Sequence, residues 1–510
     1  MKSIFNIKTF VLAAAISLVG CSSQLDEAPE LVVIQDDIDY SSTEAARGAL
    51  IGAYSKFQSM GWEQIPLLAV RGDDVNAAGD QAGFIDTDNY VYDSGNWMYN
   101  TFWENWFQDI VQITTQMEQL EKFREGGVNS ATIDQYIAEC KTLRAFITMH
   151  LSRVFGDVCR MEVSDQTKVV VLPHDDIMQW VSDQIDEATP YLLDMHPNQR
   201  TDIRGGITKY TALAVKAMAN QDIANYQAVA DATGEIINSN LFELYPDFYN
   251  LFNIPGKLCD ENLFEIQYSD LGQSSGTNVR HEFGVYAPQN FTAAKAGASN
   301  GGWGFFEPSM KYIEFMLDRG EGVRLETTVL FSNDGIAALN ADGYTSLPAF
   351  VNNTTRYGDV INNFSRANFV SGKHFLPTVQ LTDGRTAIGS NDNYTVIRYA
   401  EVLLMYAEAL THGATGTAGT ADNAVNEVRL RAGMGTLSGV TTDDVIDEKF
   451  AELATEWGVR YNDMVRLERA SELSYDGRTF NIEKAYLPYP QEQLDNNYIL
   501  REYYESQNNQ

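Results

Sequence analysis

Apolar side chains recur at spacings of three and four residues along much of this chain, the pattern that places them on one face of an α-helix. The pattern predicts helices over residues 43–58, 103–124, 133–155, 207–224, 226–238, 396–411, 421–432 and 443–457. Alanines at positions 212, 214, 217 and 219 lie in one member of the 207–224 and 226–238 pair. Small side chains let two helices approach closely, so this pair is predicted to pack as a hairpin and the fold class is predicted to be mainly α.

Two long segments, residues 60–100 and 268–395, have a different composition. They are rich in glycine, asparagine, aspartate, serine and aromatic residues, and they lack a sustained helical period. Short strand-like pieces such as residues 263–268 (LFEIQY) lie near them. Long irregular segments in compact proteins usually carry function. We therefore predict a helical scaffold that presents long irregular loops and a few short strands.

The N-terminus has the features of a secretion signal. Lys2 and Lys8 form a short basic region, residues 10–20 are apolar but too few to span a bilayer, and polar residues follow Cys21. Residues 18–21 (LVGC) resemble the bacterial lipobox, in which the cysteine is acylated and becomes the first residue after cleavage. We predict that residues 1–20 are removed and that Cys21 is lipidated; the alternative is an ordinary signal peptide without a lipid.

Composition narrows the range of partners. The chain has 510 residues, of which 44% are hydrophobic, so it can bury a large core and is not an intrinsically disordered protein. It carries 36 Lys+Arg against 70 Asp+Glu, a net charge of −34, and losing the two lysines of residues 1–20 makes this −36. Such a charge repels phosphate backbones, so nucleic acid is not expected as a partner.

Three cysteines remain once Cys21 is assigned to the lipid: Cys140, Cys159 and Cys259. An odd number cannot all pair within the chain, and no Cys-x-x-Cys or Cys/His spacing supports a zinc site. We expect these residues to be buried or half-buried thiols that pack as small apolar side chains. A Cys140–Cys159 disulfide is the alternative.

Motifs of enzymes are weak. Residues 272–276 (GQSSG) and 297–301 (GASNG) fit the Gly-x-Ser-x-Gly pattern of hydrolases, but neither is followed by a helix start, which that motif requires. Walker A, HExxH and dinucleotide-binding patterns are absent from the sequence. Acidic stretches at 86–89 and 391–393 lack the spacing of a calcium loop. The sequence predicts no catalytic residue, no metal and no cofactor.

Five motifs follow one another along the chain: 139–146 (ECKTLRAF) with 151–158 (LSRVFGDV), 397–410 (IRYAEVLLMYAEAL), 426–433 (NEVRLRAG), 448–466 and 487–494 (LPYPQEQL). In this order they resemble the motifs of one family, the SusD/RagB surface lipoproteins of Bacteroidetes. The charged residues of these motifs are expected to form structural ion pairs: Glu456 with Arg460, Asp463 with Arg466, and Arg429 and Arg431 with the glutamates at 401 and 408.

The resemblance implies a fold, a function and a location. It implies a tetratricopeptide-like scaffold in an outer-membrane lipoprotein, lipid-anchored and facing the extracellular side, that binds oligosaccharides without catalysis and passes them to a SusC-like TonB-dependent transporter. A peptide ligand is the alternative, and a surface hydrolase or a helical scaffold without a small ligand is less favoured. The resemblance also suggests an N-terminal region, residues 21–240, interlocked with a C-terminal region, residues 241–510, which is loop-rich over 268–395 and helical over 396–470.

The chemistry of sugar recognition selects candidate site residues. Pyranose rings pack their C–H faces on aromatic rings, while their hydroxyls bond to planar polar side chains. Two loops carry this mixture, and family members form a glycan site from these two regions. The candidates are Trp97 and Trp303 as stacking platforms, Tyr286 upstream of the loop that carries Trp303, and Asp74, Asn96 and Asn100 as hydroxyl partners. The alternative is that these rings pin the loops to the scaffold, which is favoured for Tyr92, Phe305 and Phe306.

Overall fold

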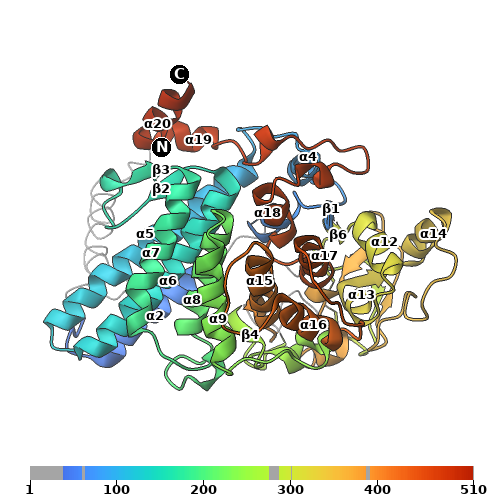
Figure 1. Ribbon diagram of the computed structural model, residues 1–510, viewed down its shortest axis with the longest axis horizontal. Coiled ribbons are helices and arrows are strands. Elements are labelled where there is room, and N and C mark those ends of the chain that lie inside the picture. Colours follow the sequence, from blue (N-terminus) through green and yellow to red (C-terminus); the bar gives the residue numbers. More distant parts are fainter. Residues whose placement is uncertain (1–37, 60–63, 275–285, 300, 386–390, 509–510) are drawn as a thin grey trace, which may run out of the picture.

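The computed structural model describes residues 38–59, 64–274, 286–299, 301–385 and 391–508, and it is mainly helical (Figure 1). The long helices of the N-terminal half form a consecutive row: α2 (Thr43–Gln58), α5 (Trp97–Glu125), α6 (Ser130–Phe155), α7 (His174–Ala188), α8 (Lys209–Asp222) and α9 (Tyr226–Asn238). From α5 onward each helix packs on the next, as in a tetratricopeptide-like scaffold. The short helices α3 (Gln64–Ala69) and α4 (Ala82–Asp88) lie between α2 and α5.

The row continues with helices from the C-terminal part of the chain. Helix α15 (Tyr399–Thr411) packs on α9 and is followed by α16 (Ala421–Arg431), α17 (Thr442–Leu453) and α18 (Val459–Arg466). The last helices, α19 (Gln491–Asn496) and α20 (Tyr498–Asn508), return to the first half, where α19 contacts α5 (Figure 1). Both regions therefore share one core; the boundary at residue 240 stays a prediction.

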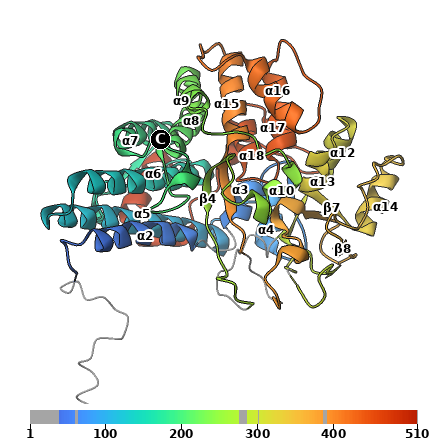
Figure 2. The same ribbon diagram turned by 90° about the horizontal axis from the view of Figure 1, so that it is seen from below.

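The remaining elements are short. Among the described residues, α10 (Phe248–Leu251) precedes the loop-rich region, which contains α12 (Met310–Asp318), α13 (Val323–Thr328) and α14 (Asn333–Ala341). Single 3₁₀ turns are η2 (Gln166–Lys168), η3 (Thr189–Tyr191), η4 (Pro197–Gln199), η5 (Ile254–Gly256), η6 (Gly372–His374), η7 (Thr378–Gln380), η8 (Ala470–Leu473) and η9 (Ile482–Lys484). Figure 2 shows α12, α13 and α14 at the opposite end of the molecule from α2, α5 and α6.

All strands of the described residues pair in antiparallel twos: β1 (Val75–Ala77) with β6 (Phe306–Pro308), β2 (Val158–Arg160) with β3 (Val170–Leu172), β4 (Asn262–Ile266) with β10 (Tyr394–Arg398), β5 (Phe291–Thr292) with β8 (Val360–Ile361), and β7 (Val329–Phe331) with β9 (Phe369–Ser371). In the first pair Val75 lies opposite Pro308 and Ala77 opposite Phe306. This pairing brings the two loop regions singled out in the sequence together.

The periodicity predicts the long helices well. Two predicted spans, 43–58 and 226–238, coincide with α2 and α9. The 103–124 prediction begins too late, because the side chain of Asn96 caps the helix and α5 starts at Trp97. The 396–411 prediction begins too early, because Tyr394–Arg398 pairs with β4 before α15 begins. Helix α7 was not predicted, and the described part of the loop segment 268–395 contains the short helices α12, α13 and α14.

The three thiols lie inside the structure, as expected. Cys140 and Cys159 are buried, Cys259 is half-buried, and all three are free, so the alternative Cys140–Cys159 disulfide is not formed. Burial raises the pKa of the Cys159 thiol to about 12, which keeps it protonated and apolar. No helix in the described part of the chain is long and apolar enough to cross a bilayer.

The charged residues of the family motifs form buried ion pairs, but several of them pair with other residues than predicted. Arg466 does pair with Asp463, at 2.6 Å. Arg429 instead pairs with Glu448, and Arg431 with Glu261 and Glu452, so neither reaches the glutamates of α15. The predicted Glu456–Arg460 pair is also wrong, because the helix is interrupted between α17 and α18; Glu456 pairs with Arg398 and Arg460 with Asp73.

Candidate functional site

Trp97 is the first residue of α5 and projects from the surface, with 52% of its area exposed. Asn96 caps this helix: its side-chain oxygen accepts a hydrogen bond from the N–H of Met98 at 3.0 Å, and its amide donates to the carbonyl of Gly83 at 3.4 Å. Met98 is buried beside it. Among the described tryptophans, Trp97 alone has more than a third of its surface exposed, which makes it a platform accessible to a ligand.

Asn100 lies one turn further along α5 and ties this helix to the C-terminal helices. Its amide donates to Oε2 of Glu492 at 2.9 Å, and its oxygen accepts from Nε2 of Gln493 at 2.8 Å. Both ends of the Asn100 amide are therefore used within the protein, as are those of Asn96. Their predicted role as sugar partners requires a shared hydrogen bond and stays a prediction.

Trp303 is half-buried in the loop that precedes β6. Its carbonyl accepts a hydrogen bond from Nη1 of Arg366 at 2.7 Å, and the Arg366 guanidinium lies 4.6 Å above the ring of Phe305. Arg366 also pairs with Asp80 at 3.1 Å, and Asp80 is well exposed. A ring beside a guanidinium and a carboxylate offers both contacts that a sugar or a peptide uses.

Glycines allow the close packing around Trp303. Gly79 has φ +78, and a Cβ there would lie 2.7 Å from Cδ of Arg366. Gly304 has φ +61, and a Cβ there would lie 2.8 Å from the ring of Phe364. Any larger residue at either position would displace the arginine or the loop that carries Trp303.

One small substructure, α4 with the β1–β6 pair, supports both aromatic loops. Phe84 of α4 contacts Phe306 of β6 with ring centroids 4.5 Å apart. Gly83 of the same helix accepts the hydrogen bond from Asn96 described above. The alternative assignment of Phe305 and Phe306 to the core is confirmed, since both are buried. The two loops are thus held by one rigid support.

Two predicted site residues are in the interior, and their assignment as surface contacts is wrong for this structure. Asp74 is buried and its Oδ2 accepts a hydrogen bond from the N–H of Thr455 at 2.7 Å. Burial raises the pKa of Asp74 to about 6. Tyr286 is fully buried and stacks on His374, with ring centroids 4.1 Å apart. Each side chain fixes a loop from below rather than meeting a ligand.

The sequence missed Asp80 and Arg366, which meet only in the folded chain. No spacing rule links residues that lie so far apart in sequence, although Gly79 beside Asp80 signalled a tight turn. Cys21 and the start of the chain lie outside the described residues. So do residues 275–285, which include the end of the 272–276 motif and its flank, and residue 300 of the 297–301 motif. Within the described residues no cluster of histidine, cysteine or carboxylate side chains could hold a metal ion.

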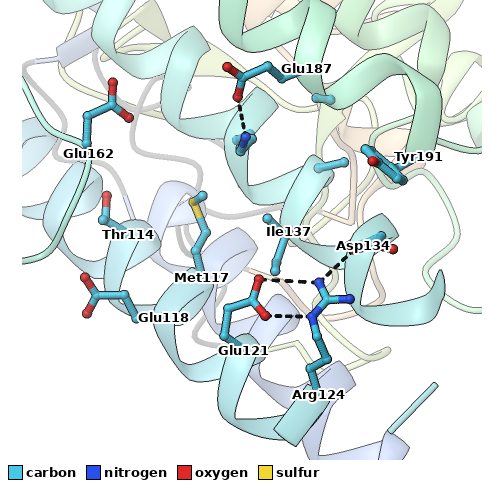
Figure 3. A pocket seen from close by; sticks show the side chains of 13 residues that line it. Thr114, Met117, Glu118, Glu121, Arg124, Asp134, Ile137, Glu162, Glu187 and Tyr191 are labelled. Atoms are coloured by element: carbon cyan, nitrogen blue, oxygen red, sulfur yellow. Dashed lines mark hydrogen bonds and ion pairs between the residues drawn. The ribbon is translucent and has the colours of Figure 1, made fainter. Parts of the chain in front are cut away.

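A separate pocket of about 350 Å³ lies between α5, α6 and α7 (Figure 3). Five of its charged side chains are paired with one another: Arg124 bonds Glu121 at 2.6 Å and Asp134 at 2.7 Å, and Lys141 bonds Glu187 at 2.5 Å. The carboxylates of Glu121, Asp134 and Glu187 are therefore held in ion pairs with cations of the same pocket.

Comparison with known proteins identifies the family. Residues 260–508 match the SusD family. A "SusD-like protein P2" of Formosa agariphila is 25% identical, and the alignment covers 91% of this chain and 91% of that protein. A "SusD-like protein" of Bacteroides ovatus is 23% identical, and the alignment covers 91% of this chain and 83% of that protein. Residues 260–508 belong to the SusD family.

Solved structures agree with this SusD-family fold. "Surface glycan-binding protein A" of Bacteroides thetaiotaomicron, solved with laminarihexaose, is 21% identical and superposes with a TM-score of 0.73 over 89% of this chain and 97% of its own. The protein of the same description from Bacteroides fluxus gives a TM-score of 0.74 with the same coverage. These TM-scores establish the shared fold.

Proposed function

We propose that this SusD-family protein is a non-catalytic glycan-binding lipoprotein of the cell surface, anchored through Cys21. It captures oligosaccharides and passes them to a SusC-like TonB-dependent transporter. The exposure of Trp97 carries this proposal, because a half-exposed indole at the start of a long helix offers a flat apolar face on which a sugar ring can stack. Relatives of the same fold are described as glycan-binding proteins, which supports a sugar as the ligand.

The proposal assigns the two tryptophans different roles. Trp97 stacks on a sugar ring. Trp303 contacts a second part of the ligand beside the Arg366–Asp80 pair, and these charged groups form hydrogen bonds with the hydroxyl groups of the sugar. The net charge of −36 on the mature chain favours a neutral glycan over a polyanionic one. Binding should therefore depend little on salt.

Affinity gel electrophoresis against laminarin, starch, xylan and mannan tests the proposal. We expect retention by at least one neutral polysaccharide. Trp97→Ala should weaken binding five- to tenfold, because losing an aromatic stack costs about 1 kcal/mol or more. Tyr191→Ala is the matched control, since Tyr191 is equally exposed, at 54%, but lies in η3 at the other pocket.

Three results would contradict the proposal. Equal retention of wild type and Trp97→Ala would remove Trp97 from the site. Absence of retention by every polysaccharide, together with peptides that co-purify and are found by mass spectrometry, would replace the glycan with a peptide ligand. Reducing-sugar release at high protein concentration would show that the protein is an enzyme. Membrane association lost in Cys21→Ser tests the anchor.

A further inference from the structure

A second cavity, of about 330 Å³, lies where the C-terminal helices meet α5. Its wall on α5 is formed by Glu104, Phe107 and Gln108. The opposite wall is formed by α19 and the first residues of α20, and η2 closes one side. No part of the proposed Trp97–Trp303 site includes this cavity.

The lining combines an aromatic ring, an apolar floor and amides. Tyr498 is 51% exposed at the rim, whereas Phe107 is buried beneath. Three amide side chains of the lining, Gln108, Gln166 and Asn496, form no hydrogen bond with another side chain or backbone group of the described residues. Amides can both donate and accept, so they match hydroxyl groups, which also do both.

The charge of the cavity argues for a neutral ligand. Its lining contains two carboxylates, Glu104 and Glu492, and among the described lining residues no lysine or arginine. Glu492 already accepts the hydrogen bond from Asn100. Without a cationic group the cavity is unsuited to a phosphate, sulfate or uronate group, while amides and an exposed tyrosine suit the hydroxyls and C–H face of a pyranose.

Helix α5 connects this cavity to Trp97. Glu104 follows Trp97 by seven residues, so the wall of the cavity begins about 10 Å along the helix axis from it. Asn100 lies between them and bonds to both Glu492 and Gln493, which line the cavity. Trp97, Asn100 and Glu104 follow the helical spacing of one face, and none of them is buried. A ligand chain on Trp97 can therefore continue along α5 into the cavity.

We propose that the cavity between α5, α19 and α20 is a second glycan subsite. It holds a neutral sugar unit of the same oligosaccharide whose other sugar ring stacks on Trp97. Tyr498 covers one face of the ring, and the amides of Gln108, Gln166 and Asn496 bond its hydroxyls. This subsite rests on the proposed function, because it requires that the protein binds a glycan. It extends the site to the C-terminal helices, beyond the two aromatic loops.

The test uses affinity electrophoresis of the full-length mature protein with laminarin, starch, xylan and mannan. Tyr498→Ala removes the stacking ring, and a Gln108→Ala/Asn496→Ala double variant removes two amides. Tyr504→Ala is the matched control, an exposed tyrosine of the same helix, at 42%, outside the cavity lining. Thermal unfolding of each variant checks that the fold is intact.

We expect Tyr498→Ala and the amide double variant each to weaken binding about fivefold for the polysaccharide that retains the wild type, with Tyr504→Ala unchanged. Retention of Tyr498→Ala and the amide variant equal to wild type, while Trp97→Ala binds weakly, would overturn the subsite and leave the proposed function standing. If no polysaccharide retains the wild type, the proposed function fails and the subsite fails with it.

Discussion

Glu452 allows a quantitative test of the buried ion-pair network. This carboxylate lies on α17, is fully buried, and accepts hydrogen bonds from Nη1 of Arg398 at 2.6 Å and Nη1 of Arg324 at 3.3 Å. It also bonds Nη2 of Arg431. Burial alone would raise the pKa of Glu452, but the three guanidinium groups lower it well below the usual range. The carboxylate is therefore charged and strongly held.

Glu452→Gln keeps the size of the side chain and removes its charge. Breaking a buried ion pair by removing one partner typically costs about 3–5 kcal/mol. Arg398 keeps Glu261 at 2.9 Å and Glu456 at 2.8 Å. Because these partners remain, we expect a loss at the lower end, about 3 kcal/mol, in the free energy of unfolding.

The assay is guanidinium unfolding followed by tryptophan fluorescence at pH 7. Glu44→Gln is the control, because it breaks a surface ion pair in which the side chain of Glu44 is 75% exposed and that of Arg47 is 35% exposed. Such a pair contributes about 0.5 kcal/mol to the free energy of unfolding. A carboxylate with a lowered pKa stabilises the fold above its unfolded pKa, about 4.3, and this contribution is lost as the pH falls. The difference between wild type and Glu452→Gln should therefore shrink in acid. Equal unfolding midpoints for Glu452→Gln and Glu44→Gln at pH 7 would refute the reasoning.

Three further predictions concern single buried positions. Burial raises the pKa of Glu401 to about 7, so the folded state holds this proton more tightly than the unfolded state and loses stability as the pH rises from 4.5 to 7. The melting temperature of Glu401→Gln should therefore equal that of wild type at pH 4.5 and exceed it at pH 8. A difference in melting temperature that does not change with pH would contradict this. Gly458→Ala should lower the melting temperature more than Gly433→Ala. Both glycines have positive φ, but of the two only Gly458 lies where a Cβ would be 2.4 Å from a backbone oxygen. Equal decreases in melting temperature would show that the positive φ alone is responsible. Cys140 and Cys159 should react with a thiol reagent only after unfolding, and fast labelling of the native protein would disprove their burial.

Local signals explain what could be predicted from the sequence. Helical spacing and N-terminal capping act within a few residues, so α2 and α9 coincide with their predicted spans. The Asp463–Arg466 pair, three residues apart on one helix, also follows from local spacing. The start of α15 does not, because Tyr394–Arg398 becomes a strand only when β4 lies beside it.

Partners distant in the sequence required the fold. Arg429 and Arg431 carry charge that must be neutralised once the fold buries them. The packing of α16 on α17 decided that Glu448 and Glu452 meet them rather than Glu401 and Glu408. Many carboxylates compete for few cations in this acidic chain, so composition leaves the choice of partner open.

For the candidate site, the sequence by itself determined the residue types that a sugar requires and the two loops that carry them. Only the tertiary structure decided which of these side chains reach solvent: Trp97 is exposed, whereas Asp74 and Tyr286 are buried beneath the loops. It also placed Tyr498 beside α5, almost four hundred residues away in sequence. The physical reason is that exposure depends on every segment packed around a side chain, whereas residue type and helical spacing are properties of the segment alone.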